Sequence, residues 1–348
     1  MFKILIFLIS VSLLSVNAQS KKGLKIWPEG VKEIKYTSSI DDSKQPSLVY
    51  TAKSKEKRPL LVGLHSWSTN YLSGGGDLLY AHWAIEQDWH FVHPHFRGEN
   101  WTPKAMGSDY VIADVVSIVE YMKKSYNVDE DRIYLIGCSG GGYASLLMAG
   151  RKPEIWAGVS AWVPISDIYA WWEERDQGSK KNSRYARNIE TVIGGRPDKD
   201  KALKEECMKR SALTYLQNAK GINIDINHGV NDGRTGSVPF THSLYAFNKL
   251  AASKDQISNS DIIEYYKTRE LPPSLKAASA DPLFGEKTTL FRRISGNARV
   301  TIFKGGHEIV HKPALNWLAN QRKSKEAVWD LKEVKEVKTS ASDSKVSR

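Results

Sequence analysis

A short glycine-rich turn carries the residue best suited to nucleophilic chemistry. The run Gly137-Cys138-Ser139-Gly140-Gly141 follows an apolar segment at 132–136 and precedes a helix-like segment at 143–149. A strand, a G-x-S-x-G turn and then a helix is the setting of a nucleophile elbow, which lifts a serine hydroxyl clear of a sheet. Glycine is needed beside the serine because the turn is too tight for side chains there. Ser139 is therefore the candidate nucleophile of a reaction that passes through an acyl-enzyme.

A serine nucleophile needs a base and an acid, and suitable residues follow it along the chain. Asp232 lies in a polar loop after the apolar segment 222–228, and His307 follows a glycine turn after the segment 298–303. His307 would take the serine proton and later return it to the leaving group, while Asp232 would fix the imidazole tautomer. Their joint placement after two successive strands predicts the catalytic triad Ser139, Asp232 and His307.

Three other residues compete for these roles. Asp167 follows the strand after the elbow and is the second candidate for the acid. His311 also follows the last strand, but it lies further along and within the next expected helix. His228 precedes Asp232, and we expect it to brace the loop that carries the acid.

The oxyanion of the tetrahedral intermediate needs two backbone amides. Gly140, directly after the nucleophile, offers one of them. The other should come from the loop after the first long central strand, where Trp67 is the first choice and Ser66 the reserve.

Alternating strands and helices are expected to position these residues. Near-continuous apolar runs are typical of parallel strands that are buried on both faces. The expected elements predict an α/β protein with a mostly parallel twisted sheet and helices on both faces. Two polar insertions, about 166–212 and 254–296, interrupt the alternation and are expected to form a lid near the site. The expected strands lie at 33–37, 47–51, 59–65, 90–94, 132–136, 156–163, 222–228 and 298–303, and the expected helices include 78–87 and 109–124.

Both ends of the chain differ from its centre. Residues 1–18 have a basic start, an apolar core and a small-residue cleavage site, which together predict a secretory signal peptide. Residues 19–321 are expected to form the catalytic domain, and the charged segment 322–348 a flexible tail. The protein is therefore expected to be exported, to a periplasm or beyond, without stable membrane insertion after cleavage. Cys138 and Cys207 are the two cysteines, and a bridge between them would be awkward beside a strained turn.

The composition narrows the function classes. With 41% hydrophobic and 26% charged residues, the chain resembles neither a membrane protein nor a disordered one. The net charge of +11 allows an acidic partner, but no nucleic-acid recognition motif accompanies it. No histidine pattern of the H-E-x-x-H kind is present, so neither a metal nor another cofactor is expected.

The motifs resemble those of an α/β-hydrolase of the prolyl-oligopeptidase type over about residues 58–320. The similar stretches are Pro94-His95-Phe96-Arg97-Gly98, Asp131-Arg132-Ile133 ahead of the elbow, and His228-Gly229 followed by Asp232 and Val238-Pro239. This resemblance implies the α/β-hydrolase fold and carries the catalytic roles over to Ser139, Asp232 and His307. Oligopeptidases of this type also have a β-propeller, for which residues 19–57 leave no room, so the catalytic domain is expected to stand alone beneath its own lid.

The substrate is the least constrained part of the prediction. Exported single-domain relatives of this type are often esterases that act on decorated polysaccharides or small esters. In the first insertion, Trp171 and Trp172 suit sugar rings, and Arg175, Lys180, Lys181, Arg184 and Arg187 suit carboxylates or sulfates. We therefore predict that the protein hydrolyses carboxylic esters on an acylated glycan, which could also be anionic. Trp171, Trp172 and Arg175 are the predicted substrate-binding residues. Packing of the two tryptophans against the core is the competing interpretation. The alternative functions are a serine peptidase and a non-catalytic glycan-binding protein, and the oligomeric state stays open.

Overall fold

The computed structural model describes residues 23–176 and 183–330. The expected signal peptide at 1–18, the lid residues Lys180 and Lys181, and the part of the tail from 331 onward lie outside the described residues.

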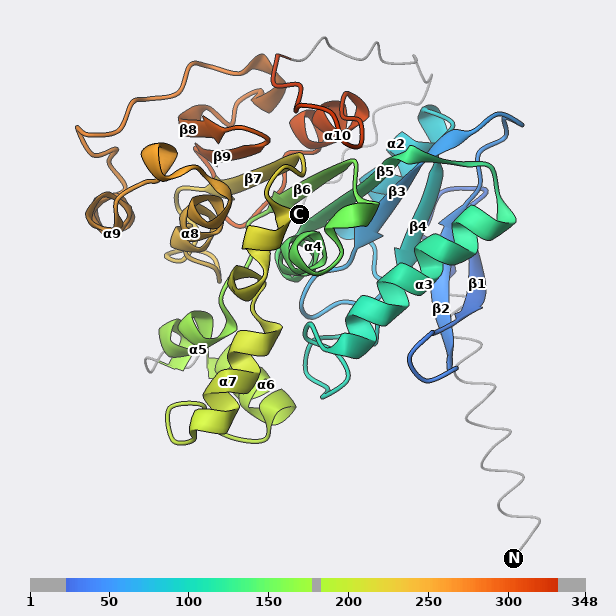
Figure 1. Cartoon of the computed structure of the whole chain (residues 1–348), viewed down its shortest axis with the longest axis horizontal. Helices are drawn as coiled ribbons and strands as arrows, with labels where there is room; N and C mark the ends of the chain where they lie inside the picture. Colours follow the sequence, from blue (N-terminus) through green and yellow to red (C-terminus); the bar gives the residue numbers. More distant parts are fainter. Residues whose placement is uncertain (1–22, 177–182, 331–348) are drawn as a thin grey trace, which may run out of the picture.

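A nine-stranded sheet forms the centre of the molecule, with the strand order β1-β2-β4-β3-β5-β6-β7-β9-β8 (Figure 1). The strands β4, β3, β5, β6, β7 and β9 run parallel, while β1, β2 and β8 are joined to the sheet by antiparallel pairing. The predicted mostly parallel sheet is thus confirmed. The strands are β1 Lys32–Thr37, β2 Lys44–Tyr50, β3 Arg58–Leu64, β4 His90–Pro94, β5 Val128–Cys138, β6 Gly158–Trp162, β7 Ile224–Gly229, β8 Thr289–Ser295 and β9 Ala298–Phe303.

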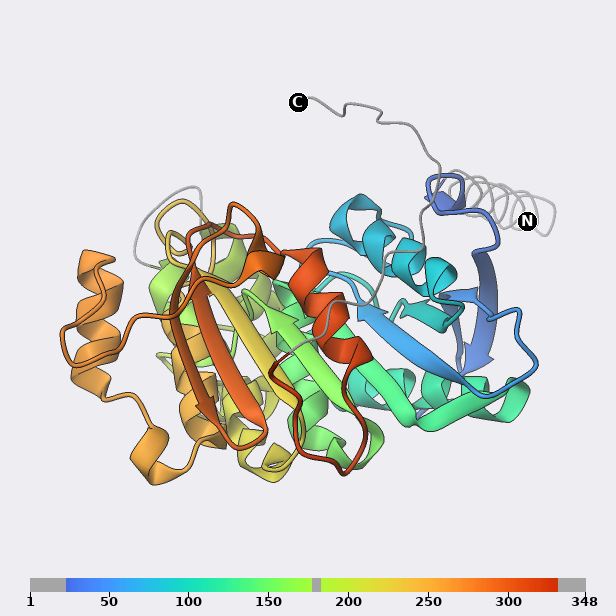
Figure 2. The ribbon, with the colours of Figure 1, turned by 90° about the horizontal axis from the view of Figure 1, so that it is seen from above.

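Helices cover both faces of the sheet (Figure 2). On one face α3 (Asp109–Ser125), α4 (Gly140–Arg151) and α8 (Thr241–Leu250) pack into the larger apolar core, which the apolar stripe of α3 illustrates. On the other face α2 (Leu78–Glu86) and α10 (His311–Ala319) pack into a second, smaller core. Because both faces are covered, β4 and β6 are buried at every residue and β3 at every residue but its first, as their continuous apolar runs predicted.

The first insertion is helical. Between β6 and β7 the chain forms α5 (Ile168–Asp176), α6 (Ser183–Ile193) and α7 (Lys201–Arg210), which group together beside the sheet in Figure 1. α5 contacts both α6 and α7, so the described part of this insertion is a small helical layer of its own.

The second insertion differs from the expectation of a wholly polar excursion. It contains α9 (Asn259–Thr268), but its last part is the edge strand β8, which pairs antiparallel with β9. The alternation in β8 is irregular, with Phe291 buried between the partly exposed Leu290 and Arg292, which hides the strand from a search for apolar runs.

The start of the expected tail is also packed against the domain. Trp329 stacks on Trp317 of α10 with the ring centroids 5.5 Å apart, and the Val328 amide donates to Gln321 Oε1. The segment 322–330, where the expected flexible tail begins, thus includes a tryptophan that packs against α10 despite the surrounding charges. Within the described ranges, no helix has the length and apolar character needed to cross a membrane.

Candidate active site

Parallel strands bring the predicted catalytic residues to one edge of the sheet. Ser139 follows β5, Asp232 follows β7, His307 follows β9 and Trp67 follows β3. These four strands are parallel, so their carboxyl ends meet at the same edge. Loops at that edge are where open α/β sheets place ligands.

The elbow holds Ser139 in a conformation that few side chains adopt. Its backbone angles are φ 59° and ψ −118°, in a region that is strained for a residue with a Cβ. The turn has no room for a side chain at Gly137, where a Cβ would lie 2.3 Å from the Gly141 carbonyl group. The Ser139 amide donates to the Trp162 carbonyl at 2.9 Å, which ties the strained residue to β6.

The triad is hydrogen-bonded from end to end. Ser139 Oγ lies 2.8 Å from His307 Nε2, and His307 Nδ1 lies 2.6 Å from Asp232 Oδ2. Because the carboxylate can only accept, Nδ1 carries the proton and Nε2 is left to accept the serine hydroxyl. This is the arrangement in which a histidine can act as general base toward serine.

Asp232 is fully buried, and its carboxylate has four donors. Oδ1 accepts from the amides of Gly233 and Val238 at 2.9 and 3.1 Å, and Oδ2 accepts from His307 and from His228 Nε2 at 3.0 Å. Burial alone would raise the pKa of Asp232, but the hydrogen bonds from His228 and His307 outweigh it and hold the pKa well below its usual range. The acid is thus ionised at neutral pH.

His228 is the buried partner of the catalytic acid. Its Nδ1 lies 2.7 Å from Ser243 Oγ, and its Nε2 also approaches the Val238 carbonyl at 3.0 Å. Since Nε2 faces two acceptors, it is the protonated nitrogen of a neutral ring, and burial lowers the pKa of His228 in the same sense. His228 therefore fixes the loop 232–238 as well as the carboxylate.

Gly140 and Trp67 lie in close backbone contact at the expected oxyanion site. A Cβ on Gly140 would be 2.3 Å from the Trp67 nitrogen and 2.6 Å from its Cα. Two amides that point to one place can share a single developing negative charge. The structure brings Trp67 rather than the reserve Ser66 to Gly140 with its backbone nitrogen.

The segment after β4 supports the Trp67 loop. The Asn100 amide donates to the Trp67 carbonyl at 2.9 Å, and His65 Nε2 lies 3.0 Å from the His95 carbonyl. Arg97 is held nearby by ion pairs with Asp114 at 2.7 Å and Asp41 at 2.9 Å. The motif 94–98 thus contacts the oxyanion loop through the His95 carbonyl, while two carboxylates hold its Arg97 side chain.

Aromatic side chains of the lid pack beside the oxyanion loop. The Trp171 ring meets the Trp67 ring edge-on at 4.8 Å, and Tyr185 lies 5.0 Å from Trp171. Trp171 also donates through Nε1 to the Ser237 carbonyl at 2.8 Å, in the loop that carries Asp232. Tyr185, which is partly exposed, was not singled out from the sequence because a lone tyrosine in a polar helix has no distinctive pattern.

The structure places the three predicted substrate-binding residues inside the lid. Trp171 and Trp172 are 1% and 2% exposed, so they bury their faces in the protein and present none to a sugar ring. Trp172 Nε1 donates to Glu190 Oε1 at 3.0 Å, which links α5 to α6. Arg175 is 6% exposed on the same helix. The two tryptophans therefore pack against the core, as the competing interpretation predicted.

The remaining candidates lie elsewhere. Asp167 accepts from the Ala170 amide at the start of α5, and His311 opens α10 with its Nε2 near the Gly76 carbonyl. Neither is the residue paired with His307 or Ser139. Cys138 and Cys207 are both free thiols.

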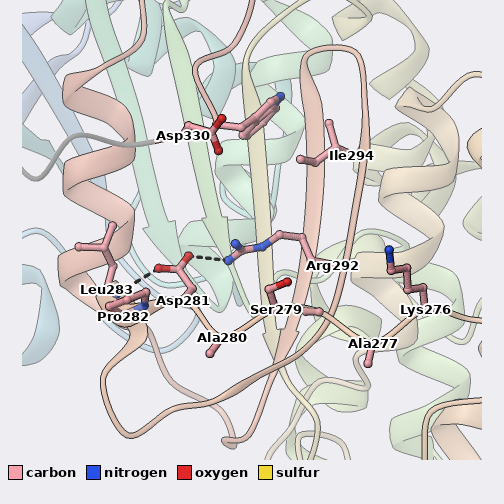
Figure 3. Close-up of a pocket in the computed structure, with 12 residues that line it drawn as sticks. Lys276, Ala277, Ser279, Ala280, Asp281, Pro282, Leu283, Arg292, Ile294 and Asp330 are labelled. Carbon is pink, nitrogen blue, oxygen red and sulfur yellow. Dashed lines mark hydrogen bonds and ion pairs between the residues drawn. The ribbon is translucent and has the colours of Figure 1, made fainter.

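A cavity of about 860 Å³ lies apart from the triad, on the sheet face beside β8 (Figure 3). Arg292 crosses it to an ion pair with Asp281 at 2.8 Å. None of the triad residues lines it. This cavity is therefore separate from the catalytic residues.

Comparisons with known proteins concern the family and the fold of this chain. A family model described as the prolyl oligopeptidase family matches residues 81–265. An acylaminoacyl peptidase of Pyrococcus horikoshii is similar at 20% identity over 63% of this chain and 34% of its own, with a TM-score of 0.50. An acylaminoacyl peptidase solved with Z-Gly-Gly-Phe-chloromethyl ketone is similar at 17% identity over 86% and 43%, with a TM-score of 0.56. A thermostable esterase is similar at 16% identity over 85% and 64%, with a TM-score of 0.50.

These solved structures confirm the predicted α/β-hydrolase fold. The chain spans less than two thirds of the length of each of them, and at such identities the likeness concerns the fold. No curated protein matches the chain.

Proposed function

This chain belongs to the prolyl oligopeptidase family of serine hydrolases, and from that premise we propose that it hydrolyses carboxylic esters through an acyl-enzyme on Ser139. The observation that carries the proposal is the unbroken hydrogen-bonded series from Ser139 Oγ through His307 to Asp232.

Acylation follows from the positions of these atoms. Ser139 Oγ attacks the ester carbonyl carbon while His307 Nε2 takes the hydroxyl proton, and the carbonyl oxygen becomes an oxyanion. The amides of Gly140 and Trp67 stabilise that oxyanion, and Asp232 stabilises the imidazolium through Nδ1. The intermediate then collapses, the carbon–oxygen bond to the alcohol breaks, and His307 gives its proton to the leaving alcohol.

Deacylation repeats the same steps with water. His307 removes a proton from a water molecule, the hydroxide attacks the acyl carbon, and Ser139 leaves with the proton returned by His307. The products are the carboxylic acid, the alcohol and the free enzyme, so atoms and protons balance without any cofactor.

The proposed substrate is an acyl group on a polysaccharide outside the cell. Its support is the signal-like segment 1–18 and the cluster of Trp67, Trp171 and Tyr185 beside the oxyanion loop, in which Tyr185 is partly exposed. Tyr185 takes the sugar-facing role that the buried Trp171 and Trp172 do not have. Export predicts that the mature protein begins at Gln19, which N-terminal sequencing of the exported protein would check.

Matched esters and amides test the reaction class. We expect turnover of 4-nitrophenyl acetate and release of acetate from acetylated xylan, and little turnover of alanyl 4-nitroanilide. Faster cleavage of the anilide than of both esters would make the protein a peptidase. Binding of acetylated xylan without turnover of any of the three compounds would make it a glycan-binding protein.

A further inference from the structure

Arg175 is a buried cation that has no acceptor among the residues that the structure describes. It ends the inward stripe of α5, whose residues Ile168, Trp171, Trp172 and Arg175 follow helical spacing. The side chain is 94% buried, and its Nε and Nη1 are enclosed without a hydrogen-bond partner. Burying an unpaired charge carries a large desolvation penalty, so an anion bound next to Arg175 would be stabilising.

Arg269, in the second insertion, repeats this pattern. Its Nε and Nη1 are also enclosed without a partner, and Nη2 donates to the main-chain carbonyl of Asp232 at 3.4 Å. The guanidinium carbon lies 3.9 Å from the centroid of the Tyr266 ring, which offsets only part of the charge. Burial lowers the pKa of Arg269, and the nearby Tyr266 and Asp232 offset only part of that effect.

Arg269 contacts the loop that carries the catalytic acid, and Arg175 lies on a helix that contacts the same loop. Trp171 donates to the Ser237 carbonyl of that loop, and Arg175 follows Trp171 by one turn on the same helical face. Arg269 contacts the other end of the loop at Asp232. Two cations with unpartnered nitrogens, one from each insertion, thus lie on segments that contact the loop 232–238.

The neighbouring carboxylates are already engaged. Asp232 is filled by its four donors, and Glu174 pairs with His242 at 3.2 Å. Other arginines of the lid have acidic partners, Arg196 with Asp176 at 2.6 Å and Arg210 with Glu206 at 2.8 Å. Unpaired buried nitrogens are therefore a property of Arg175 and Arg269 among the arginines that the structure describes.

We infer that Arg175 and Arg269 receive an anionic group of the substrate, a carboxylate or sulfate on the glycan, beside the catalytic loop. A guanidinium fork suits both anions, because its parallel N–H groups match two oxygens of either one. The inference rests on the proposed function, since it assigns a charge to the glycan whose ester is cleaved. Arg175, without an aromatic partner for its charge, is the main receptor, and Arg269 assists it.

Binding to an inactive variant tests the inference without ester chemistry. The protein carries Ser139→Ala, and the probes are oligogalacturonate, a sulfated galactan oligosaccharide and neutral xylohexaose, measured by calorimetry. We expect at least one anionic probe to bind ten-fold or more tightly than xylohexaose, and the tighter of the two identifies carboxylate or sulfate. Equal affinity for all three probes would overturn the inference.

Two further substitutions assign the binding to Arg175. Arg175→Gln should weaken the anionic probe by ten-fold or more, whereas Lys201→Gln should change it less than two-fold. The second variant removes the same charge from a lid side chain that is 92% exposed. Equal effects of the two variants would mean that general charge attracts the probe, and the assignment would fail.

A stability measurement separates a binding role from a structural one. Without ligand, Arg175→Met should raise Tm, because it removes a buried charge that nothing neutralises. A fall in Tm would show that the free protein already compensates Arg175 and would contradict the inference. These results are independent of the proposed function, which 4-nitrophenyl acetate turnover by the unmodified protein tests separately.

Discussion

Replacing Gly140 by alanine gives the sharpest test of how the oxyanion site is built. The added Cβ would lie 2.3 Å from the Trp67 nitrogen, whereas ordinary contact begins at 3.4 Å. The two backbones must therefore separate by about 1 Å, the difference between these distances, because the obstructing atoms belong to the main chain.

This separation sets the size of the expected effect. Oxyanion donors act at about 2.7–3.1 Å, so a shift of about 1 Å takes one amide out of hydrogen-bond range. Loss of one such donor lowers kcat by about 100- to 1000-fold, which corresponds to about 2.7–4 kcal/mol of transition-state stabilisation. Overpacking should also reduce the free energy of unfolding by about 1–3 kcal/mol.

The assay is steady-state hydrolysis of 4-nitrophenyl acetate, together with thermal unfolding to verify the fold. Gly306→Ala is the matched control beside the same triad, because its Cβ would meet only Thr235 Oγ1 at an ordinary 3.7 Å. We expect the control to keep kcat within about three-fold, well below the loss of a donor. If Gly140→Ala folds and also keeps kcat within that margin, the contact between Gly140 and Trp67 does not set the oxyanion site.

Three further predictions concern the surroundings of the site. His228→Asn removes a donor from the buried Asp232 carboxylate, so we expect a loss of about 1.5–3 kcal/mol in unfolding free energy by urea titration. Because the pKa of Asp232 is lower in the folded state than the value of about 3.9 in the unfolded chain, its ionised carboxylate stabilises the fold above that pH, and the contribution is lost as the pH falls. His228→Asn should therefore move the midpoint of acid unfolding to higher pH. An unchanged midpoint would contradict the assigned hydrogen bond. Burial raises the pKa of Asp77 to about 7, which favours the folded state at low pH and weakens it as the pH rises from about 4 to 7. Asp77→Asn should accordingly raise Tm at pH 8 more than at pH 4, and the reverse order would refute the burial of the charge. Trp171→Ala should lower the unfolding free energy by about 3–5 kcal/mol in urea titrations, because the ring is buried between Trp67 and Tyr185; a change in KM alone would show that the ring faces the substrate instead.

The sequence predicted the parts of the site that depend on backbone order. Ser139, Asp232 and His307 each follow a strand, and parallel pairing brings strand ends together whatever the remaining side chains are. The glycines of the elbow also predicted the site, because they allow two main-chain segments to come close together, and this depends on the backbone alone.

Side-chain burial in the insertions could not be predicted in this way. Trp171 and Trp172 look the same in sequence whether they face a ligand or the core, and their environment is decided by α6 and the loop 232–238. Arg175 resembles the other lid cations until the structure shows which of them have acidic partners. Strand β8 was missed because its alternation is irregular at the sheet edge.

Labelling of the active-site serine tests the central claim most directly. The mature protein is treated with a fluorophosphonate, digested and analysed by mass spectrometry, while 4-nitrophenyl acetate turnover is followed in parallel and compared with Ser139→Ala. We expect one adduct, on Ser139, with turnover lost in proportion to labelling and absent in the variant. Labelling of another residue, or turnover that survives both the adduct and Ser139→Ala, would contradict the triad as the catalytic centre.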